Sequence, residues 1–207
     1  MSTGLGRRER NRLEKLKRIT DAARDLFRSK GYEATTARQI CERADIGTGT
    51  LFLYVKEKRE LLAIIFQPLA EGCLVRITRD LGENESVVDG LYRIFRALSG
   101  LYGKDPEMAR LFVQDLLFRS NRGPKMEALN DDLQSRVEEM VATAQRRGDL
   151  RDDVSVKNLS GAFFAHYVLW LQIWLGHGTM TERAACRGLR SALQLQFDGA
   201  AEKGKKS

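Results

Sequence analysis

The chain has 207 residues, 43% of them hydrophobic and 30% charged, and a formal net charge of +7. That length supports one or two small domains with buried cores. Residues 1–60 hold 15 Lys and Arg against 9 Asp and Glu, so +6 of the charge lies there and the rest of the chain is nearly neutral. A basic end on a neutral body is typical of a module that binds phosphate, and a merely solvated charged face is the alternative.

The three cysteines and two histidines are too sparse for a metal site with a recognisable spacing. Cys41, Cys73 and Cys186 contain no Cys-x-x-Cys pair, and each is expected to be a small buried residue. We therefore expect a reduced, cytoplasmic protein with no metal and no cofactor. The chain also lacks a nucleophile elbow, a phosphate loop and dinucleotide-binding glycines, so an enzyme is not expected.

The first predicted helix lies in the basic part of the chain. Apolar residues recur at three- and four-residue steps from Leu13 to Phe27, and Lys30-Gly31 is a typical helix stop. Before this helix, four arginines within residues 7–12 form a basic arm. Such an arm reaches either an adjacent DNA minor groove or only the phosphate backbone.

A second, short helix is expected to begin at Thr36. Thr36 and Gln39 have the spacing of a capping box, in which each side chain bonds to the other residue's backbone N–H. Ile40 and Ala44 then share one face of the helix. Asp45 is a turn former, so the helix should stop near Ala44.

A third helix is expected over residues 47–54, with Leu51 and Val55 buried one turn apart. Thr48, Phe52 and Leu53 would then face outward, and exposed apolar side chains suggest a binding surface. Two short helices joined by a tight turn are typical of a helix-turn-helix, whose second helix enters the DNA major groove. A small amphipathic pair inside an ordinary helical core is the alternative.

The remainder of the chain is predicted to be helical, since no segment alternates with the period of a half-buried strand. Pro68 falls inside the first of these helices and should kink or break it. The segment 201–207 is too polar to pack and is expected to be disordered. The expected helices cover residues 58–81, 87–101, 106–118, 125–146, 154–174 and 182–197.

The segment 159–175 is apolar on nearly all sides, but Ser160, His166 and Gln172 lie within it. We expect a buried helix with one face on a second chain rather than a membrane span. The last helix adds a stripe of small residues that lets a partner helix approach closely. A homodimer through the last two helices is therefore predicted. The stripe comprises Ala184, Ala185, Gly188 and Ala192.

Several of these segments resemble the signature of the tetracycline-repressor (TetR) family of transcription regulators. They are residues 31–36 (Gly-Tyr-Glu-Ala-Thr-Thr), residues 49–56 (Gly-Thr-Leu-Phe-Leu-Tyr-Val-Lys) and residues 58–62 (Lys-Arg-Glu-Leu-Leu). The resemblance implies an all-α fold with a three-helix DNA-binding head and a helical body that binds a ligand and dimerises. We accordingly expect a DNA-binding domain over 1–57, a body over 58–200 and a tail over 201–207.

The resemblance also implies which residues contact double-stranded operator DNA. Gly47 departs from the usual serine cap, Thr48 stands where the family often has a charged or long polar residue, and Phe52 replaces a more usual tyrosine. Residues 47–55 contain no Arg, Lys, Asn or Gln, so bidentate purine contacts must come from elsewhere, and Arg38 is the expected reader of a guanine. The implied DNA-binding residues are Thr36, Arg38, Gly47, Thr48, Gly49, Thr50, Phe52, Leu53, Tyr54 and Lys58.

The body is expected to hold a pocket for a flat, largely apolar effector, with polar contacts from Asp115, Gln114 or His166. For each residue, a place in the plain core is the alternative. We expect a repressor that a small apolar or amphipathic molecule releases from a palindromic operator; an activator, or a DNA-binding protein without a ligand response, is the alternative. The expected pocket residues are Phe66, Leu69, Cys73, Phe95, Tyr102, Phe112, Asp115, Phe118, Met140, Phe163, His166, Tyr167 and Trp170.

Overall fold

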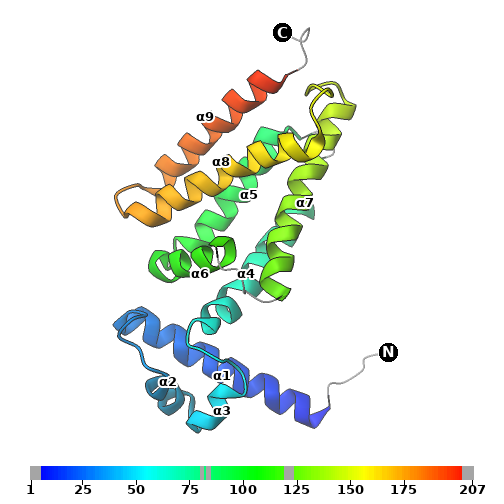
Figure 1. Ribbon diagram of the computed structural model, residues 1–207. Coiled ribbons are helices and arrows are strands. Elements are labelled where there is room, and N and C mark those ends of the chain that lie inside the picture. Colours follow the sequence, from blue (N-terminus) through cyan, green and yellow to red (C-terminus); the bar gives the residue numbers. More distant parts are fainter. Residues whose placement is uncertain (1–5, 80–81, 83–84, 119–123, 202–207) are drawn as a thin grey trace. The chain divides into compact units, whose positions relative to one another are not determined.

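A computed structural model describes the chain except for residues 1–5, 80–81, 83–84, 119–123 and 202–207 (Figure 1). Within the described ranges every regular element is an α-helix, which confirms the all-α prediction; one isolated bridge joins Leu150 and Ala201. The rest of the tail predicted to be disordered lies outside the described residues. The helices are α1 (Arg7–Lys30), α2 (Ala37–Ala44), α3 (Thr48–Phe52), α4 (Glu60–Arg79), α5 (Val87–Tyr102), α6 (Pro106–Phe118), α7 (Pro124–Arg146), α8 (Val156–His177) and α9 (Glu182–Ala200).

Backbone contacts divide the chain into two compact units, residues 1–68 and residues 69–207, called here the head and the body. The division falls at Pro68, inside α4, so the first nine residues of this helix belong to the head. A domain boundary after residue 57 stays a prediction. The helix α4 continues through Pro68, although the proline has no N–H to donate to the Ile64 carbonyl.

Local sequence signals explain how the head helices begin and end. Gly31 ends α1 with a positive φ of 83°, and its N–H donates to the Phe27 carbonyl at 2.9 Å. The capping box is present: Thr36 Oγ1 accepts from the Gln39 N–H, and Gln39 Oε1 accepts from the Thr36 N–H. Asp45 ends α2 in the left-handed conformation, with φ of 52°. The helix stop, the capping box and the turn that predict a helix-turn-helix are therefore all present in the structure.

The first helix is longer than the sequence pattern indicated. It begins at Arg7, so the basic arm predicted over residues 7–12 forms the first turns of α1. Hydrophobic periodicity could not find these turns, because they are exposed and have no apolar face to bury. Buried residues from α1, α2 and α3 close the core of the head, and they include Ile19, Ala23, Phe27, Ile40, Ala44 and Leu51.

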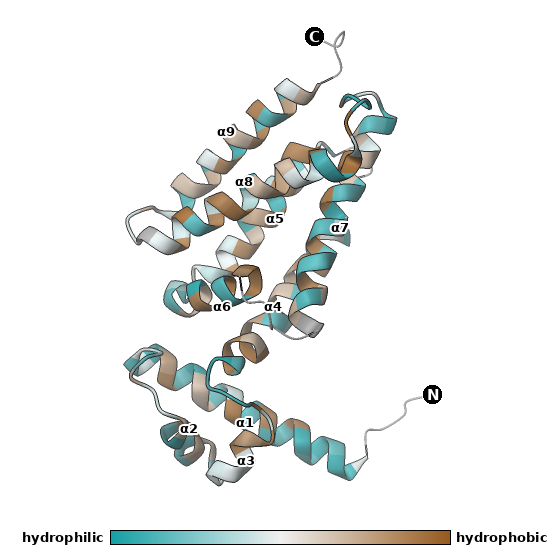
Figure 2. Cartoon of the chain, viewed as in Figure 1, coloured by the Kyte–Doolittle hydropathy of each residue, from teal (hydrophilic) through white to brown (hydrophobic). Residues whose placement is uncertain are grey.

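In the body, α5 packs against α9 and α7, while α8 packs against α6, α7 and α9 (Figure 1). Figure 2 shows brown, hydrophobic stretches of α8 separated by paler and teal turns. At the α8–α9 contact the Trp170 ring lies over Gly188, so that a Cβ added to Gly188 would stand 2.0 Å from the ring. The largest fully buried side chains of the body include Phe95, Tyr102, Phe112 and Phe163.

Among the described residues, the segment Val156–Gly176 of α8 is long and apolar enough to cross a membrane by length and composition. Core helices of soluble proteins meet the same criteria, and Phe163, Tyr167 and Leu171 of this segment are buried in the body. In the same described part of the chain, no group of three or more His, Cys, Asp or Glu side chains is arranged to hold a metal ion.

Candidate DNA-binding interface and effector cavity

The five-residue helix α3 presents an uncharged surface. Leu51 is its buried anchor, whereas Phe52 is 54% exposed and Leu53 is 84% exposed. Gly47 caps the helix without a side-chain hydrogen bond, and Thr48 and Gly49 beside it are exposed. The methyl and ring surfaces of this helix suit contact with thymine methyl groups, which lie in the major groove.

The start of α2 supplies polar groups. The Thr36 hydroxyl accepts a capping hydrogen bond and still has its own proton to donate, for example to a phosphate. Arg38 is exposed, and its Nε donates to Glu42 Oε1 at 2.8 Å. This hydrogen bond and the Glu42 charge raise the pKa of Arg38, so the guanidinium stays charged. Because the pair is at the surface, Arg38 can exchange Glu42 for a base at little cost.

Lys58 has a role that the sequence did not indicate. Its Nζ donates to the carbonyl oxygens of Tyr32 at 2.7 Å and Thr35 at 2.9 Å, with Glu33 O at 3.5 Å, and lies 4.1 Å from the centre of the Tyr32 ring. Lys58 also precedes α4, which begins at Glu60, so it does not occupy the first turn of that helix. The ammonium therefore ties the α1–α2 loop to the segment after α3. A phosphate contact by Lys58 stays a prediction.

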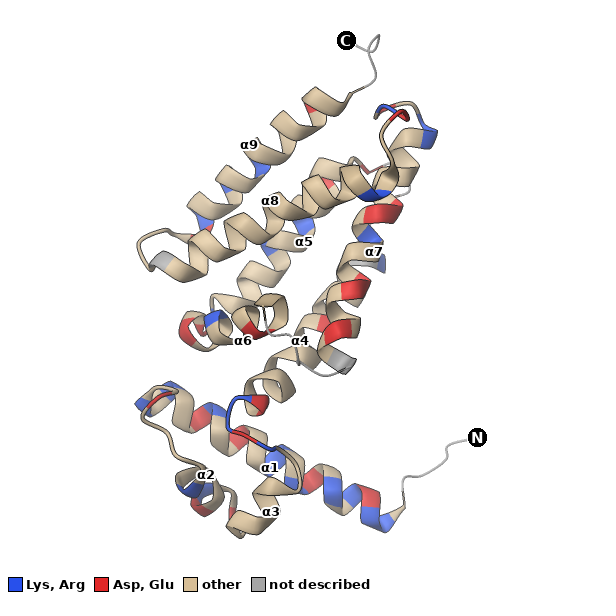
Figure 3. Cartoon of the chain, viewed as in Figure 1, with Lys and Arg blue, Asp and Glu red and all other residues tan. Residues whose placement is uncertain are grey.

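Tyr54 and the exposed start of α1 complete the surface. The half-buried Tyr54 donates its hydroxyl proton to the Arg12 carbonyl at 3.4 Å, which docks the segment after α3 onto α1. Figure 3 shows basic residues along α1 and none on α3. Within the described residues, Arg7, Arg8 and Arg10 form no ion pair, so their charges are available to phosphates.

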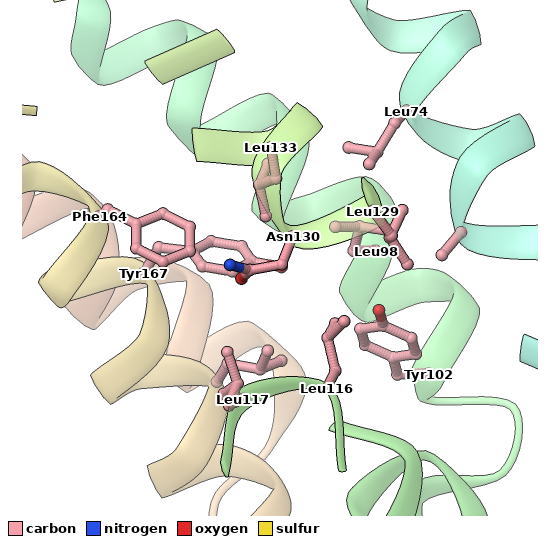
Figure 4. Close-up of a pocket in the computed structure, with 12 residues that line it drawn as sticks. Leu74, Leu98, Tyr102, Leu116, Leu117, Leu129, Asn130, Leu133, Phe164 and Tyr167 are labelled. Carbon is pink, nitrogen blue, oxygen red and sulfur yellow. The ribbon is translucent and has the colours of Figure 1, made fainter. Parts of the chain in front are cut away.

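The body contains a separate, partly enclosed cavity with a volume of about 10 Å³, close to the minimum that holds one water molecule. Its wall is apolar apart from two phenol groups and one amide (Figure 4). Helices α4, α5, α6, α7 and α8 all contribute to it. The lining residues are Ala70, Leu74, Leu98, Tyr102, Leu116, Leu117, Leu129, Asn130, Leu133, Phe164, Tyr167 and Leu171.

Of the thirteen residues expected to line an effector pocket, the structure brings Tyr102 and Tyr167 to this wall. The other eleven residues do not line this cavity. Phe95, Phe112 and Phe163 are fully buried in the core of the body, and Phe66 is buried in the head. Outside the lining, Cys73 and Asp115 are buried, Met140 and His166 are half-buried, Leu69 and Phe118 are exposed, and the Trp170 ring covers Gly188. Gln114, expected as a polar contact, is exposed. An effector-binding role for these residues stays a prediction.

Asn130 was missed, although the sequence contained a signal. It lies one turn after Met126 and next to Leu129, on a helix whose buried residues recur as Met126, Leu129, Leu133 and Val137. A polar amide beside such an apolar stripe indicates either a buried partner or a ligand. The remaining lining residues are mostly leucines, which periodicity assigns to the core without telling a cavity wall from a filled interior.

The three cysteines are all buried and free, as expected of small apolar core residues. Burial raises the pKa of the Cys41, Cys73 and Cys186 thiols. Hydrogen bonding between Thr48 and Cys41 and between Ser99 and Cys186 opposes that shift without reversing it. The thiols are therefore protonated at neutral pH and react slowly with oxidants.

Comparison with known proteins places the helix-turn-helix in a family. The family model described as "Bacterial regulatory proteins, tetR family" matches residues 19–65, which include α2, α3 and the Lys58 anchor. The chain therefore carries a DNA-binding head of the TetR family. It is therefore a DNA-binding transcriptional regulator, and TetR-family proteins bind operator DNA and small-molecule effectors, typically as dimers.

Similarity to other TetR-family proteins extends beyond the head. The repressor KstR of Rhodococcus jostii is 25% identical over 187 residues, covering 89% of this chain and 82% of KstR. The regulator UidR of Escherichia coli is 25% identical over 143 residues, covering 67% of this chain and 70% of UidR. The crystal structure of Thermus thermophilus FadR with lauroyl-CoA has a TM-score of 0.70 at 24% identity, covering 93% of this chain and 98% of FadR, which shows a shared fold.

Proposed function

We propose that this TetR-family chain is a homodimeric repressor, released from a palindromic operator when a small apolar molecule enters the body cavity. The exposed, uncharged surface of α3 beside the exposed arginines at the start of α1 carries the proposal. Phe52 and Leu53 are too exposed to serve the core of the head, and Arg7, Arg8 and Arg10 are exposed and form no ion pair with any residue that the structure describes. The α3 side chains would contact base edges, while the α1 arginines would bind the DNA phosphate backbone without regard to sequence.

A homodimer through α8 and α9 is supported by what these helices leave exposed. Leu169 of α8 is 48% exposed and Leu195 of α9 is 75% exposed, and Gly161 and Ala165 share the open face of α8. Small residues on that face allow close approach of a second helix pair. Gly188 is not part of this face, since Trp170 of the same chain covers it. A two-fold dimer would then present its recognition helices to half-sites about 34–36 Å apart.

The size of the cavity sets a condition on release by an effector. With a volume of about 10 Å³ it has no room for an organic molecule, so an effector must displace helices of the body as it enters. Such an effector binds a rearranged conformation of the body more tightly than the conformation described here. Only this difference in affinity can shift the dimer away from its DNA-binding arrangement. The structure of FadR with lauroyl-CoA makes long-chain acyl thioesters the first molecules to test.

The test is a footprint of the full-length dimer on DNA upstream of its own gene, repeated with increasing lauroyl-CoA. We expect protection of one inverted repeat and loss of protection as the thioester is added. Protection that persists with every effector tried would support a DNA-binding protein without a ligand response, and transcription that rises with occupancy would support an activator. No protected repeat would refute the proposal.

A further inference from the structure

A second hollow of the body lies between α5 and α9, and we call it the α5–α9 groove. Among the described residues it shares none of its lining with the cavity described above. Its volume of about 520 Å³ falls within the range of about 300–1,000 Å³ that is usual for small-molecule sites. The lining is basic, and it consists of Tyr92, Arg96, Glu182, Arg183, Cys186 and Arg187.

The arginines of this groove differ from their neighbours in their ion pairs. Arg93 of α5 pairs with Glu85 and Arg190 of α9 pairs with Asp89, each at 2.7 Å. Outside residues 1–60, acidic residues are nearly as numerous as basic ones, so carboxylates are not scarce in the body. Nevertheless, in the part of the chain that the structure describes, three exposed arginines of the groove make no side-chain hydrogen bond or ion pair, namely Arg96, Arg183 and Arg187.

The single carboxylate of the groove is directed to another partner. Glu182 Oε1 accepts a hydrogen bond from the hydroxyl of the fully buried Ser99 at 2.9 Å, which ties the start of α9 to α5. Three guanidinium groups and one carboxylate leave a net charge of +2 on the lining. Arg183 and Arg187 stand four residues apart on α9, a spacing at which like charges destabilise a helix. An anion bound between them would relieve this repulsion.

The aromatic part of the groove is held in place. The Arg190 guanidinium lies over the Tyr92 ring, with its central carbon 4.9 Å from the ring centre, and Asp89 holds the same guanidinium from the start of α5. The Tyr92 side chain therefore has little freedom to lose when a ligand contacts it. An aromatic ring beside three cations suits a ligand that joins an organic part to an anionic group.

We propose that the α5–α9 groove binds a small organic molecule through a phosphate monoester group, as a site separate from the body cavity. A phosphate monoester carries a charge of about −1.5 to −2 near neutral pH and three acceptor oxygens. These match the net charge of the lining and its three guanidinium groups, each of which can donate two parallel hydrogen bonds. A carboxylate offers a single charge and two oxygens. The volume of the groove leaves room for an organic part beside Tyr92.

Carboxylates of a second copy of the chain are the alternative occupant of the groove. Helix geometry places the arginines away from the dimer face proposed above. Each residue advances a helix by about 100°, so Arg183 and Arg187 lie roughly 120° and 80° around α9 from Leu195. The groove is therefore on a different face of α9, where a dimer through Leu169 and Leu195 would leave it open to a small molecule.

The experiment titrates the full-length protein with adenosine 5′-monophosphate (AMP) in a calorimeter at fixed ionic strength. Wild type should bind AMP more tightly than inorganic phosphate, and adenosine, which lacks the phosphate, should not bind. The double variant Arg183→Gln/Arg187→Gln should bind AMP about 10- to 100-fold more weakly, the range expected for two charged hydrogen bonds that stay open to water. AMP should also raise the melting temperature of the wild type more than that of this variant.

Arg110→Gln/Arg146→Gln is the matched control, since it removes the same two charges from α6 and α7 outside the groove; it should keep the wild-type affinity for AMP. Equal weakening in both double variants would show attraction by overall charge only and would overturn the inference. Binding of AMP no tighter than that of adenosine or inorganic phosphate, or tighter binding of citrate than of AMP, would also overturn it. A dimer that dissociates in Arg183→Gln/Arg187→Gln, with no AMP binding by the wild type, would instead assign these arginines to the interface between subunits.

Discussion

Replacing Gly188 by alanine has two opposite effects on stability: a gain in helix propensity and a steric clash with Trp170. Alanine is favoured over glycine in a helix interior by about 0.5–1 kcal/mol, so helix propensity alone predicts a more stable protein. The structure predicts the reverse. A Cβ at position 188 would lie 2.0, 2.2 and 2.6 Å from three carbon atoms of the Trp170 ring, all far inside contact distance. The indole moves as one rigid plane, so it must leave its place between α8 and α9.

Overpacking of this kind costs about 1–3 kcal/mol. Subtracting the propensity gain of about 0.5–1 kcal/mol, we expect Gly188→Ala to lower the free energy of unfolding by up to about 2.5 kcal/mol. Urea denaturation followed by far-ultraviolet circular dichroism measures this free energy. All variants are compared at one protein concentration, because the unfolding midpoint of a dimer depends on concentration. Trp170→Leu in the same background should recover part of the loss, as expected for two residues in direct contact.

Gly199→Ala is the matched control on the same helix. No atom lies within 4 Å of a Cβ built there, and its φ is not positive, so this variant should gain about 0.4–1 kcal/mol. If Gly188→Ala gains stability as Gly199→Ala does, the close approach of Trp170 to α9 is refuted.

Three further predictions concern the head. Lys58→Met should lower the free energy of unfolding by about 1.5–3 kcal/mol, because the Tyr32 and Thr35 carbonyls lose a charged hydrogen-bond donor. An unchanged free energy of unfolding, together with a salt dependence of DNA binding that falls by about one phosphate contact, would instead support a phosphate contact by Lys58. Arg38→Ala should weaken operator binding about 5- to 150-fold and relax preference at one G·C pair per half-site, and equal weakening on all sequences in an operator scan would contradict direct readout. Replacing Arg7, Arg8 and Arg10 by glutamine should flatten the salt dependence of DNA affinity on every sequence, and an unchanged slope would show that these cations are idle.

The sequence predicted the head better than the body because local interactions determine most of the head. The Thr36 capping box, the Asp45 turn and the Gly31 stop each depend on residues within a few positions, and each is confirmed. Burial of Leu51 and exposure of Leu53 followed from helical periodicity alone. The role of Lys58 did not, because its carbonyl partners lie 23 to 26 residues earlier in the chain.

The cavity was harder to predict because its wall depends on how helices pack. Aromatic residues were favoured for the pocket, yet Phe95, Phe112 and Phe163 fill the core while leucines form most of the lining. The sequence pattern favours a pocket position for Trp170 and a partner face for Gly188, whereas in the structure the Trp170 ring covers Gly188. Composition and periodicity identify which side chains are buried, but the neighbour of each depends on helix rotation and spacing.

The surface of α3, with Phe52 and Leu53 exposed and no long polar side chain, has a consequence for the operator as a chemical object. A protein that recognises bases by their C5 methyl groups detects the methyl group in the major groove and not the hydrogen-bonding pattern of the base pair. Uracil in place of thymine would remove the feature without altering the encoded sequence, whereas 5-methylcytosine would create it on a different base. If α3 contacts these methyl groups as proposed, operator affinity should change with covalent modification of the DNA bases.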